Sequence, residues 1–285
     1  MHAMHPEPRA SSPLPPAGSV ERWCWDFIVG TELQEKLRPQ DPPDTSLAAN
    51  WEDSAPERRL NAAGRPAELE VIARSPRTPG GLHQPANRLR MMHTFAHHEL
   101  QAAELFAWAV LAFPETPREF KAGAVRLCLE ELGHLHLYVD YLRAHGLALG
   151  EFPVRDWFWE RVSTCASPLA FVSLQGLGLE GSNLDHCARF ALAFRDVGDT
   201  RAAQVLERVG RDEVTHVSFA RQWFERLSGE TLNYERWRAV LPAPLTPALM
   251  QGRPLNNEAR RAAGFDDSFL DALANAGSTT SRATS

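Results

Sequence analysis

Two copies of a Glu-x-x-His motif constrain this chain more than any other feature of its sequence. The first copy begins at Glu131 and ends at His134, and the second begins at Glu213 and ends at His216. Residues three apart lie on the same face of an α-helix, so each motif can bring a carboxylate and an imidazole to one point. A single motif of this kind is common by chance, but a duplicated one predicts a paired ligand site.

A glutamate precedes each motif at nearly the same distance. Glu99 lies 32 residues before Glu131, and Glu180 lies 33 residues before Glu213. A turn centred near residue 115 would place residue 99 opposite residue 131 in an antiparallel helical hairpin, which favours Glu99 over Glu104. Both glutamates stay open as the ligand of the first hairpin. The repeated offset predicts two hairpins with matching ligand positions.

The pattern of apolar residues predicts four long helices in the middle of the chain. They are expected at residues 88–113, from the proline-bounded turn at 114–117 to about 145, from about 167 onward with a break near Gly181, and at 200–227. The whole chain is expected to be all-α, in five parts: a disordered tail at 1–18, an extension at 19–87 with one helix and irregular segments, the bundle at 88–229, a helical extension at 230–275, and a disordered tail at 276–285. Both extensions are expected to wrap the bundle.

Burial of four carboxylates in one bundle needs positive charge. Acidic side chains that leave water cost several kcal/mol each and repel one another unless cations lie between them. Two divalent ions balance four glutamates, and neutral imidazoles complete the coordination. Carboxylate and imidazole donors suit iron or manganese, and the absence of thiolates argues against structural zinc. The candidate metal ligands are Glu99, Glu131, His134, Glu180, Glu213 and His216.

Several neighbours of these residues are candidates for supporting roles. Glu130 and Asp212 each directly precede the glutamate of a motif, where each could accept a hydrogen bond from the histidine of the other motif. Glu104 is expected beside the ligands if Glu99 coordinates the metal. Tyr138 follows His134 by four residues, one turn along the same helix face, and is the candidate for a catalytic side chain. A core tyrosine is the alternative reading of Tyr138.

The order of glutamate, Glu-x-x-His, glutamate and Glu-x-x-His resembles the ferritin-like di-iron carboxylate superfamily. That superfamily includes the ribonucleotide reductase small subunit, bacterial multicomponent monooxygenases, rubrerythrin and a tRNA-modifying hydroxylase. Four segments are similar to an uncharacterised ferritin-like family that carries the label of a domain of unknown function and shares the layout of that hydroxylase: HELQAAEL at 98–105, EELGH at 130–134, RDEVTH at 211–216, and PLNNEAR at 254–260 with AGF at 263–265.

This resemblance covers roughly residues 85–270 and implies a ferritin-like four-helix bundle with two metal ions and oxygen chemistry. In the ribonucleotide reductase small subunit, the radical-bearing tyrosine has the same spacing after its histidine as Tyr138 has after His134. The large size and the carboxy-terminal docking tail of that enzyme are not evident in this chain.

Composition excludes several other classes of protein. The longest apolar run, residues 105–113, is far shorter than the roughly 20 residues needed to cross a bilayer. A formal net charge of −6 without basic clusters disfavours a nucleic-acid partner. The first residues lack the basic and apolar regions of a secretory signal, and the four cysteines form no CxxC pair, so we expect reduced thiols in the cytoplasm.

Together these features predict an oxygen-dependent oxidase or hydroxylase. Its cofactors would be two iron ions, with a manganese–iron pair as the alternative, and dioxygen would be its co-substrate. Its partners would be a small-molecule substrate and an electron donor, with no membrane, and a homodimer is compatible with the sequence. Two other classes stay open: ferritin-like metal storage or detoxification, which needs a closed multimeric cage, and a bundle used for partner binding with a structural metal site.

Overall fold

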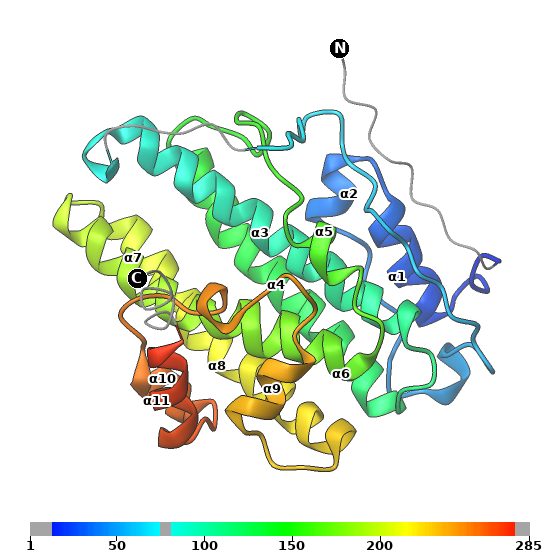
Figure 1. The fold of residues 1–285 in the computed structure, drawn as a ribbon. Helices are drawn as coiled ribbons and strands as arrows, with labels where there is room; N and C mark the ends of the chain where they lie inside the picture. Colours follow the sequence, from blue (N-terminus) through cyan, green and yellow to red (C-terminus); the bar gives the residue numbers. More distant parts are fainter. Residues whose placement is uncertain (1–12, 75–80, 277–285) are drawn as a thin grey trace. The chain divides into compact units, whose positions relative to one another are not determined.

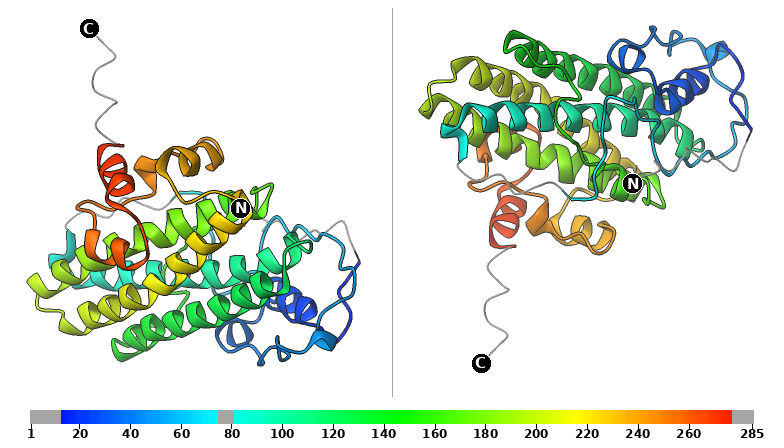
Figure 2. Two further views of the ribbon diagram at one scale, coloured as in Figure 1. Left: turned by 90° about the horizontal axis from the view of Figure 1, so that it is seen from below. Right: turned by 90° about the horizontal axis from the view of Figure 1, so that it is seen from above.

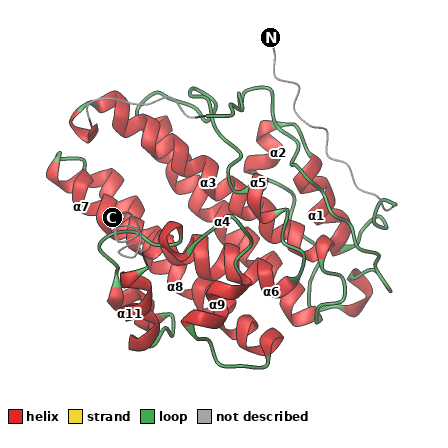
Figure 3. Cartoon of the chain, viewed as in Figure 1, coloured by secondary structure: helices red, strands yellow, loops and turns green. Residues whose placement is uncertain are grey.

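The computed structural model describes residues 13–74 and 81–276, and its regular structure is helical. The described residues form no strand, only an isolated parallel bridge between Val71 and Val154 (Figure 3). The chain divides into two compact units, residues 1–164 and residues 165–285. In the described ranges, no helix is long and apolar enough to span a membrane. The prediction of an all-α chain is confirmed for these residues.

The first unit is organised by a helical hairpin. Helices α3 (Pro85–Ala112) and α4 (Arg118–Ala144) lie side by side and run antiparallel (Figures 1 and 2). Pro85 occupies the first turn of α3, where a missing N–H has no cost, and Pro117 directly precedes α4. Every residue from Glu99 to Ala112 is buried, so α3 is an interior helix throughout its second half. The hairpin and its turn match the prediction from the sequence.

The N-terminal extension adds two helices where one was expected. Helix α1 (Val20–Val29) begins at Ser19, whose hydroxyl accepts a hydrogen bond from the backbone N–H of Arg22 at 3.0 Å, as an N-cap residue should. It ends at Gly30, and α2 (Leu33–Leu37) is a separate helix. The η1 (Ala48–Asn50) and η2 (Gly81–His83) turns follow. Gly64 packs against the end of α1: its backbone N–H donates to the carbonyl oxygen of Ile28 at 2.9 Å. A Cβ on Gly64 would lie 2.1 Å from the carbonyl oxygen of Val29, so this approach requires glycine.

The expected tails fall mostly on residues that the structure does not describe, namely 1–12 and 277–285. Residues 13–18 are described, and the carbonyl oxygen of Pro13 accepts a hydrogen bond from Nε of Arg58 at 2.7 Å. The first residues after position 12 are therefore tied to the first unit.

Buried polar residues of α3 anchor the irregular segment that follows α4. The backbone N–H of Gly150 donates to Nε2 of His93 at 2.8 Å, and Nε2 of His97 lies 2.9 Å from Oδ1 of Asp156. The side-chain oxygen of Gln101 accepts from the backbone N–H of Phe158 at 3.1 Å. The one-turn helix α5 (Trp159–Val162) ends this segment.

The second unit contains a second hairpin, and one of its arms is irregular. That arm consists of α6 (Pro168–Phe171), η3 (Val172–Glu180) and α7 (Gly181–Asp196), and the other arm is α8 (Thr200–Ser228). Ser167 caps α6 and Asp199 caps α8, and Gly229 ends α8 in the left-handed conformation with φ of 72°. The expected break near Gly181 is a nine-residue π-helix, η3, that ends at Glu180.

Three short helices follow in the second unit: α9 (Tyr234–Val240), α10 (Asn257–Ala262) and α11 (Asp267–Asn275), with a 3-10 turn, η4 (Pro247–Leu249), between the first two. Asp185 of α7 holds this extension through ion-pair contacts of 3.0 and 2.7 Å with Nε and Nη2 of Arg260. Its carboxylate also accepts from the backbone N–H groups of Gly252 and Asn256. Asn256 and Arg260 therefore belong to a polar network that holds the extension on α7.

Candidate metal centre

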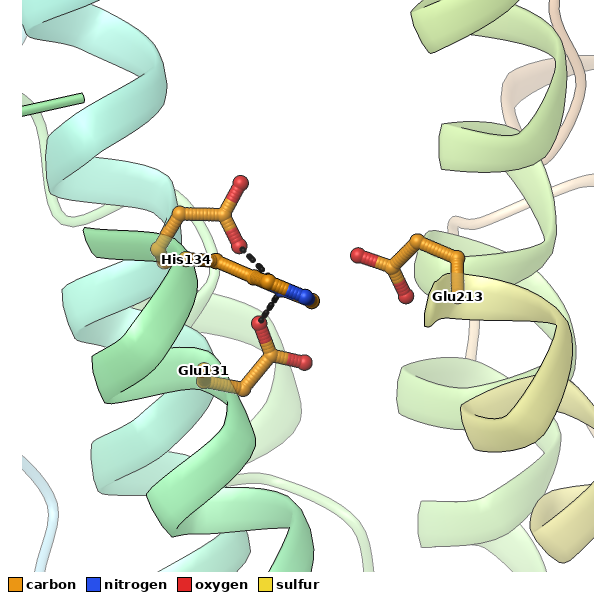
Figure 4. A group of neighbouring side chains, drawn as sticks. Glu131, His134 and Glu213 are labelled. Carbon is orange, nitrogen blue, oxygen red and sulfur yellow. Dashed lines mark hydrogen bonds and ion pairs between the residues drawn. The ribbon is translucent and has the colours of Figure 1, made fainter. Parts of the chain in front are cut away.

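The first unit gathers three of the predicted ligands. Glu99 of α3 and Glu131 and His134 of α4 are all buried, and their ligand atoms lie within 4.8 Å of one another. Nδ1 of His134 is 3.2 Å from Oε2 of Glu131 (Figure 4). The same nitrogen is 3.8 Å from Oε2 of Glu99. We call these residues the first triad. The first helix of the hairpin supplies one carboxylate, and the Glu-x-x-His motif of the second supplies the other two groups.

The second unit gathers the other three. Glu180 at the end of η3, and Glu213 and His216 of α8, are buried and also have their ligand atoms within 4.8 Å of one another. Nδ1 of His216 is 3.1 Å from Oε2 of Glu213, which projects from α8 (Figure 4). These residues form the second triad. It repeats the composition of the first triad: one glutamate from the first arm of a hairpin and a Glu-x-x-His pair from the second.

Both imidazoles present the same nitrogen to the carboxylates. Nδ1 is the atom of His134 and of His216 that lies near the glutamate oxygens, so Nδ1 is the ligand atom that each triad offers. The other nitrogen, Nε2, is on the far side of the ring. A histidine that binds a metal through one ring nitrogen usually donates from the other to a carboxylate or carbonyl group, which fixes its tautomer.

Glu130 and Asp212 were predicted to be the acceptors of those Nε2 hydrogen bonds. On their own helices, Oε1 of Glu130 lies 3.7 Å from Nε of Arg126, and Oδ2 of Asp212 accepts from Nε of Arg208 at 2.7 Å. The predicted hydrogen bond of each acid with the histidine of the other motif stays a prediction.

Crowding of acids in the first triad makes it suited to a cation. Burial raises the pKa of Glu99 well above its usual value, and the nearby charge of Glu131 raises it further, although the hydrogen bond with His134 lowers it. Two carboxylates this close in a dry interior cannot both be ionised at low cost. A divalent ion would remove that cost, because its charge of +2 cancels the two negative charges of the carboxylates. The donor set of oxygen and nitrogen atoms fits iron or manganese.

Glu104 does not belong to this triad. Its oxygens accept hydrogen bonds from Nζ of Lys36 at 2.7 Å, from Nη1 and Nη2 of Arg65 at 2.7 and 2.9 Å, and from Nε1 of Trp159 at 2.7 Å. Burial alone would raise the pKa of Glu104, but the charges of Arg65 and Lys36 hold it below its usual value. Two cations of the N-terminal extension thus neutralise Glu104, whereas Glu99 lies beside Glu131 and His134. This arrangement favours Glu99 as the ligand of the first hairpin, and a supporting role for Glu104 stays a prediction.

The structure adds two amides to the second triad that sequence reasoning did not select. Nδ2 of Asn183 donates to Oε1 of Glu213 at 2.9 Å, and Nε2 of Gln175 donates to Oε1 of Glu180. Asn183 had a detectable signal, because it follows Glu180 by three residues and therefore shares its helix face. Gln175 had no such signal, because residues five apart share no face of an α-helix.

The remaining candidates lie around the first triad. Tyr138 is buried one turn after His134, and its ring centroid is 6.0 Å from that of Phe95, which is ordinary core packing. Its catalytic role stays a prediction. His98 stacks on Phe158 with centroids 4.7 Å apart. Together with His97, these two rings line a cavity of about 330 Å³.

Comparison with known proteins gives a family without an activity. A family model described as "Protein of unknown function (DUF455)" matches residues 31–271. A protein of Haemophilus influenzae described as "Uncharacterized protein" is 26% identical over 189 residues, which are 63% of this chain and 65% of that relative. The chain thus spans less than two thirds of that relative's length. No solved structure matches the chain.

Proposed function

Since the chain belongs to the DUF455 family of proteins of unknown function, we propose its activity from its own ligand residues: the two triads together hold two metal ions in an oxygen-dependent oxidase or hydroxylase. The observation that carries this proposal is the repetition of one buried donor set, two carboxylates and an imidazole, in two separate hairpins. Structural ion pairs do not require such a repetition.

Charge sets the number of ions. Each triad contains two buried glutamates and a histidine that is neutral when it serves as a ligand, so one divalent cation per triad brings its charge to zero. Oxygen and imidazole donors favour iron or manganese, and the four cysteines are buried elsewhere than in the triads. We infer that the hairpins α3–α4 and η3/α7–α8 supply the helices of a ferritin-like four-helix bundle.

Two ferrous ions with open coordination positions would supply the reduction of dioxygen, with electrons from an external donor. The residues of this chain have separate tasks. The four glutamates hold and neutralise the ions, and Asn183 fixes one oxygen of Glu213 so that the other faces the ligand position. Burial of both triads excludes bulk water, and Tyr138 places a phenol one turn from His134. The substrate would be a small molecule held beside the ions.

The test of this proposal is metal content. Protein purified without air and loaded with ferrous ion should contain two irons per chain by elemental analysis. Glu131→Gln and Glu213→Gln should each lose at least one iron, whereas Glu119→Gln, at an exposed position in the first turn of α4, should retain both. Equal iron content in all four proteins would rule out the triads as the site.

Oxygen reactivity is tested separately on the loaded protein. Addition of air-saturated buffer should consume oxygen and change the visible absorption spectrum within the dead time or the first seconds of stopped-flow mixing. A protein with two irons per chain and no spectral change would keep the metal site and exclude the oxidase. The size of the assembly in solution distinguishes metal storage, which requires a closed cage.

A further inference from the structure

Gln175 and Glu180 are paired inside the second unit by an unusual helix. Both lie in η3, where they are 0% and 4% exposed, and Nε2 of Gln175 donates a hydrogen bond to Oε1 of Glu180. The two residues are five apart. In an α-helix, residues three and four apart are neighbours, whereas the i→i+5 pattern of a π-helix brings residues five apart together. The π-helix therefore creates this contact.

Close packing maintains η3 against α8. A Cβ on Gly176 would lie 2.2 Å from the Cβ of Ala220, so only glycine allows η3 to approach α8 this closely. Gln175 is the residue just before this contact. Its side chain is thus held on a backbone that has little room to move.

The chemistry of the pair fixes the orientation of the amide. A carboxylate has only acceptors, so the nitrogen of Gln175 must face Glu180. The amide oxygen then points away from the carboxylate, and among the residues that the structure describes it has no hydrogen-bond partner. A buried acceptor without a donor is unfavourable and is rare in folded proteins. A molecule that carries an N–H or O–H group would satisfy it.

We propose that Gln175 is a positioning residue for Glu180, and that its amide oxygen receives the N–H or O–H group of the molecule that enters beside the second triad. This inference rests on the proposed metal site. It specifies the class of ligand: a small polar molecule with a metal-binding oxygen and a neighbouring hydrogen-bond donor. Gln175 itself does not bind the metal.

The first experiment measures metal affinity. Cobalt(II) titrations, followed by absorption, should show two ions bound to the wild type and about 10- to 100-fold weaker binding of one of them in Gln175→Leu, the usual loss when a residue that orients a ligand is removed. Gln251→Leu is the matched control, since Gln251 is also buried in the second unit and its amide donates to the carbonyl oxygen of Leu273. Its side-chain oxygen, like that of Gln175, has no hydrogen-bond partner among the described residues. Its two affinities should equal those of the wild type.

The second experiment tests whether the amide oxygen of Gln175 accepts a hydrogen bond from a bound ligand. Acetohydroxamic acid and N-methylacetohydroxamic acid bind metals through the same two oxygens, but only the first has an N–H. For each cobalt-loaded protein, the measured quantity is the ratio of its affinity for acetohydroxamic acid to its affinity for the N-methyl compound. This ratio should be about two- to tenfold higher in the wild type and in Gln251→Leu than in Gln175→Leu. Comparing the ratio between variants removes the steric effect of the methyl group. An unchanged ratio in Gln175→Leu would overturn the acceptor role.

The outcomes distinguish a failure of the role proposed for Gln175 from a failure of the proposed metal site. A wild type that binds no cobalt overturns both. A wild type with two ions, together with a Gln175→Leu protein of unchanged affinities, overturns only the positioning role. If far-UV circular dichroism shows that Gln175→Leu is unfolded, Gln175→Met keeps the length of the side chain without its amide and takes its place in both experiments.

Discussion

Arg65 and Glu104 form a buried two-pronged ion pair, with Nη1 2.7 Å from Oε1 and Nη2 2.9 Å from Oε2. Lys36 adds a second cation at 2.7 Å from Oε1. Burial lowers the pKa of Lys36 to about 8, although Glu104 acts in the opposite direction. Glu104 is therefore a shared counter-charge for two buried cations, and it stabilises the contact between α3 and the N-terminal extension.

Replacement of Glu104 should destabilise the protein without removing metal. Glu104→Gln leaves Lys36 buried without its carboxylate partner and leaves Arg65 with Asp156 alone, 3.0 Å from its Nε, so we expect a loss of about 3–5 kcal/mol in the free energy of unfolding. Urea denaturation measures this loss. Glu99→Gln is the comparison, because it should lose metal and leave the metal-free protein at least as stable as the wild type. A loss of iron from folded Glu104→Gln would contradict this division of roles.

Acid should weaken the first unit through His93. Burial, followed by the nearby His97 and Arg90, lowers the pKa of His93 from 6.5 to about 4. As the pH falls below 6.5, His93 becomes protonated in the unfolded chain, whereas in the folded chain it stays neutral until about pH 4. The free energy of unfolding therefore falls as the pH falls through this window. The fold also favours the neutral form of His93, because its Nε2 must be unprotonated to accept the hydrogen bond from the backbone N–H of Gly150.

His93→Gln should flatten this dependence. Its amide oxygen can accept the same N–H but does not titrate, so the stability difference between pH 7 and pH 5 should be smaller in the variant than in the wild type. Denaturation curves at several pH values measure the difference, and nuclear magnetic resonance titration of the His93 ring checks the pKa directly. Identical pH profiles for the two proteins would refute the assignment to His93.

Local spacing in the sequence was enough to predict the first hairpin. Pro114 and Pro117 bound the turn, and helical periodicity extends on both sides of it, so α3 and α4 begin and end close to the predicted positions. Each Glu-x-x-His pair follows from the helix repeat alone. Reflection of residue 131 about the turn also selected Glu99, which the structure places beside Glu131.

Features that depend on distant residues could not be predicted in this way. The charges that neutralise Glu104 come from Lys36 and Arg65, which lie 68 and 39 residues away in the sequence. The pairing of Gln175 with Glu180 requires a π-helix, and the glycines of that segment indicated only a break. Periodicity reports which face of a helix is apolar, and it carries no information about partners brought together by packing.

Gly176 should be intolerant of a side chain. Gly176→Ala places a methyl group 2.2 Å from the Cβ of Ala220, and overpacking of this kind costs about 1–3 kcal/mol. The double variant with Ala220→Gly removes the clash and should recover part of the loss, as a thermodynamic cycle would show. Gly133→Ala is the control, because no atom lies within 4 Å of its added Cβ and alanine is favoured over glycine in a helix by about 1 kcal/mol. Equal effects at the two positions would exclude the packing explanation.

Arg260 should determine whether the C-terminal extension stays bound to α7. Its side chain is 0% exposed and pairs with the equally buried Asp185, which also accepts the backbone N–H groups of Gly252 and Asn256. Removing one partner of a buried pair leaves the other charge uncompensated, so Arg260→Leu should cost about 3–5 kcal/mol. Arg261→Leu removes an adjacent arginine whose ion pair with Asp267 is exposed, and surface pairs contribute about 0–1 kcal/mol.

Hydrogen exchange tests whether this loss is local. In Arg260→Leu, the amides of Gly252 and Asn256 should exchange faster than in the wild type, because the carboxylate that accepts them is no longer held in place by the guanidinium. In Arg261→Leu, both amides should exchange at the wild-type rate. If the two variants exchange alike, the extension is held by its apolar contacts, such as those of Trp237 and Phe269, and the buried ion pair adds no stability to it.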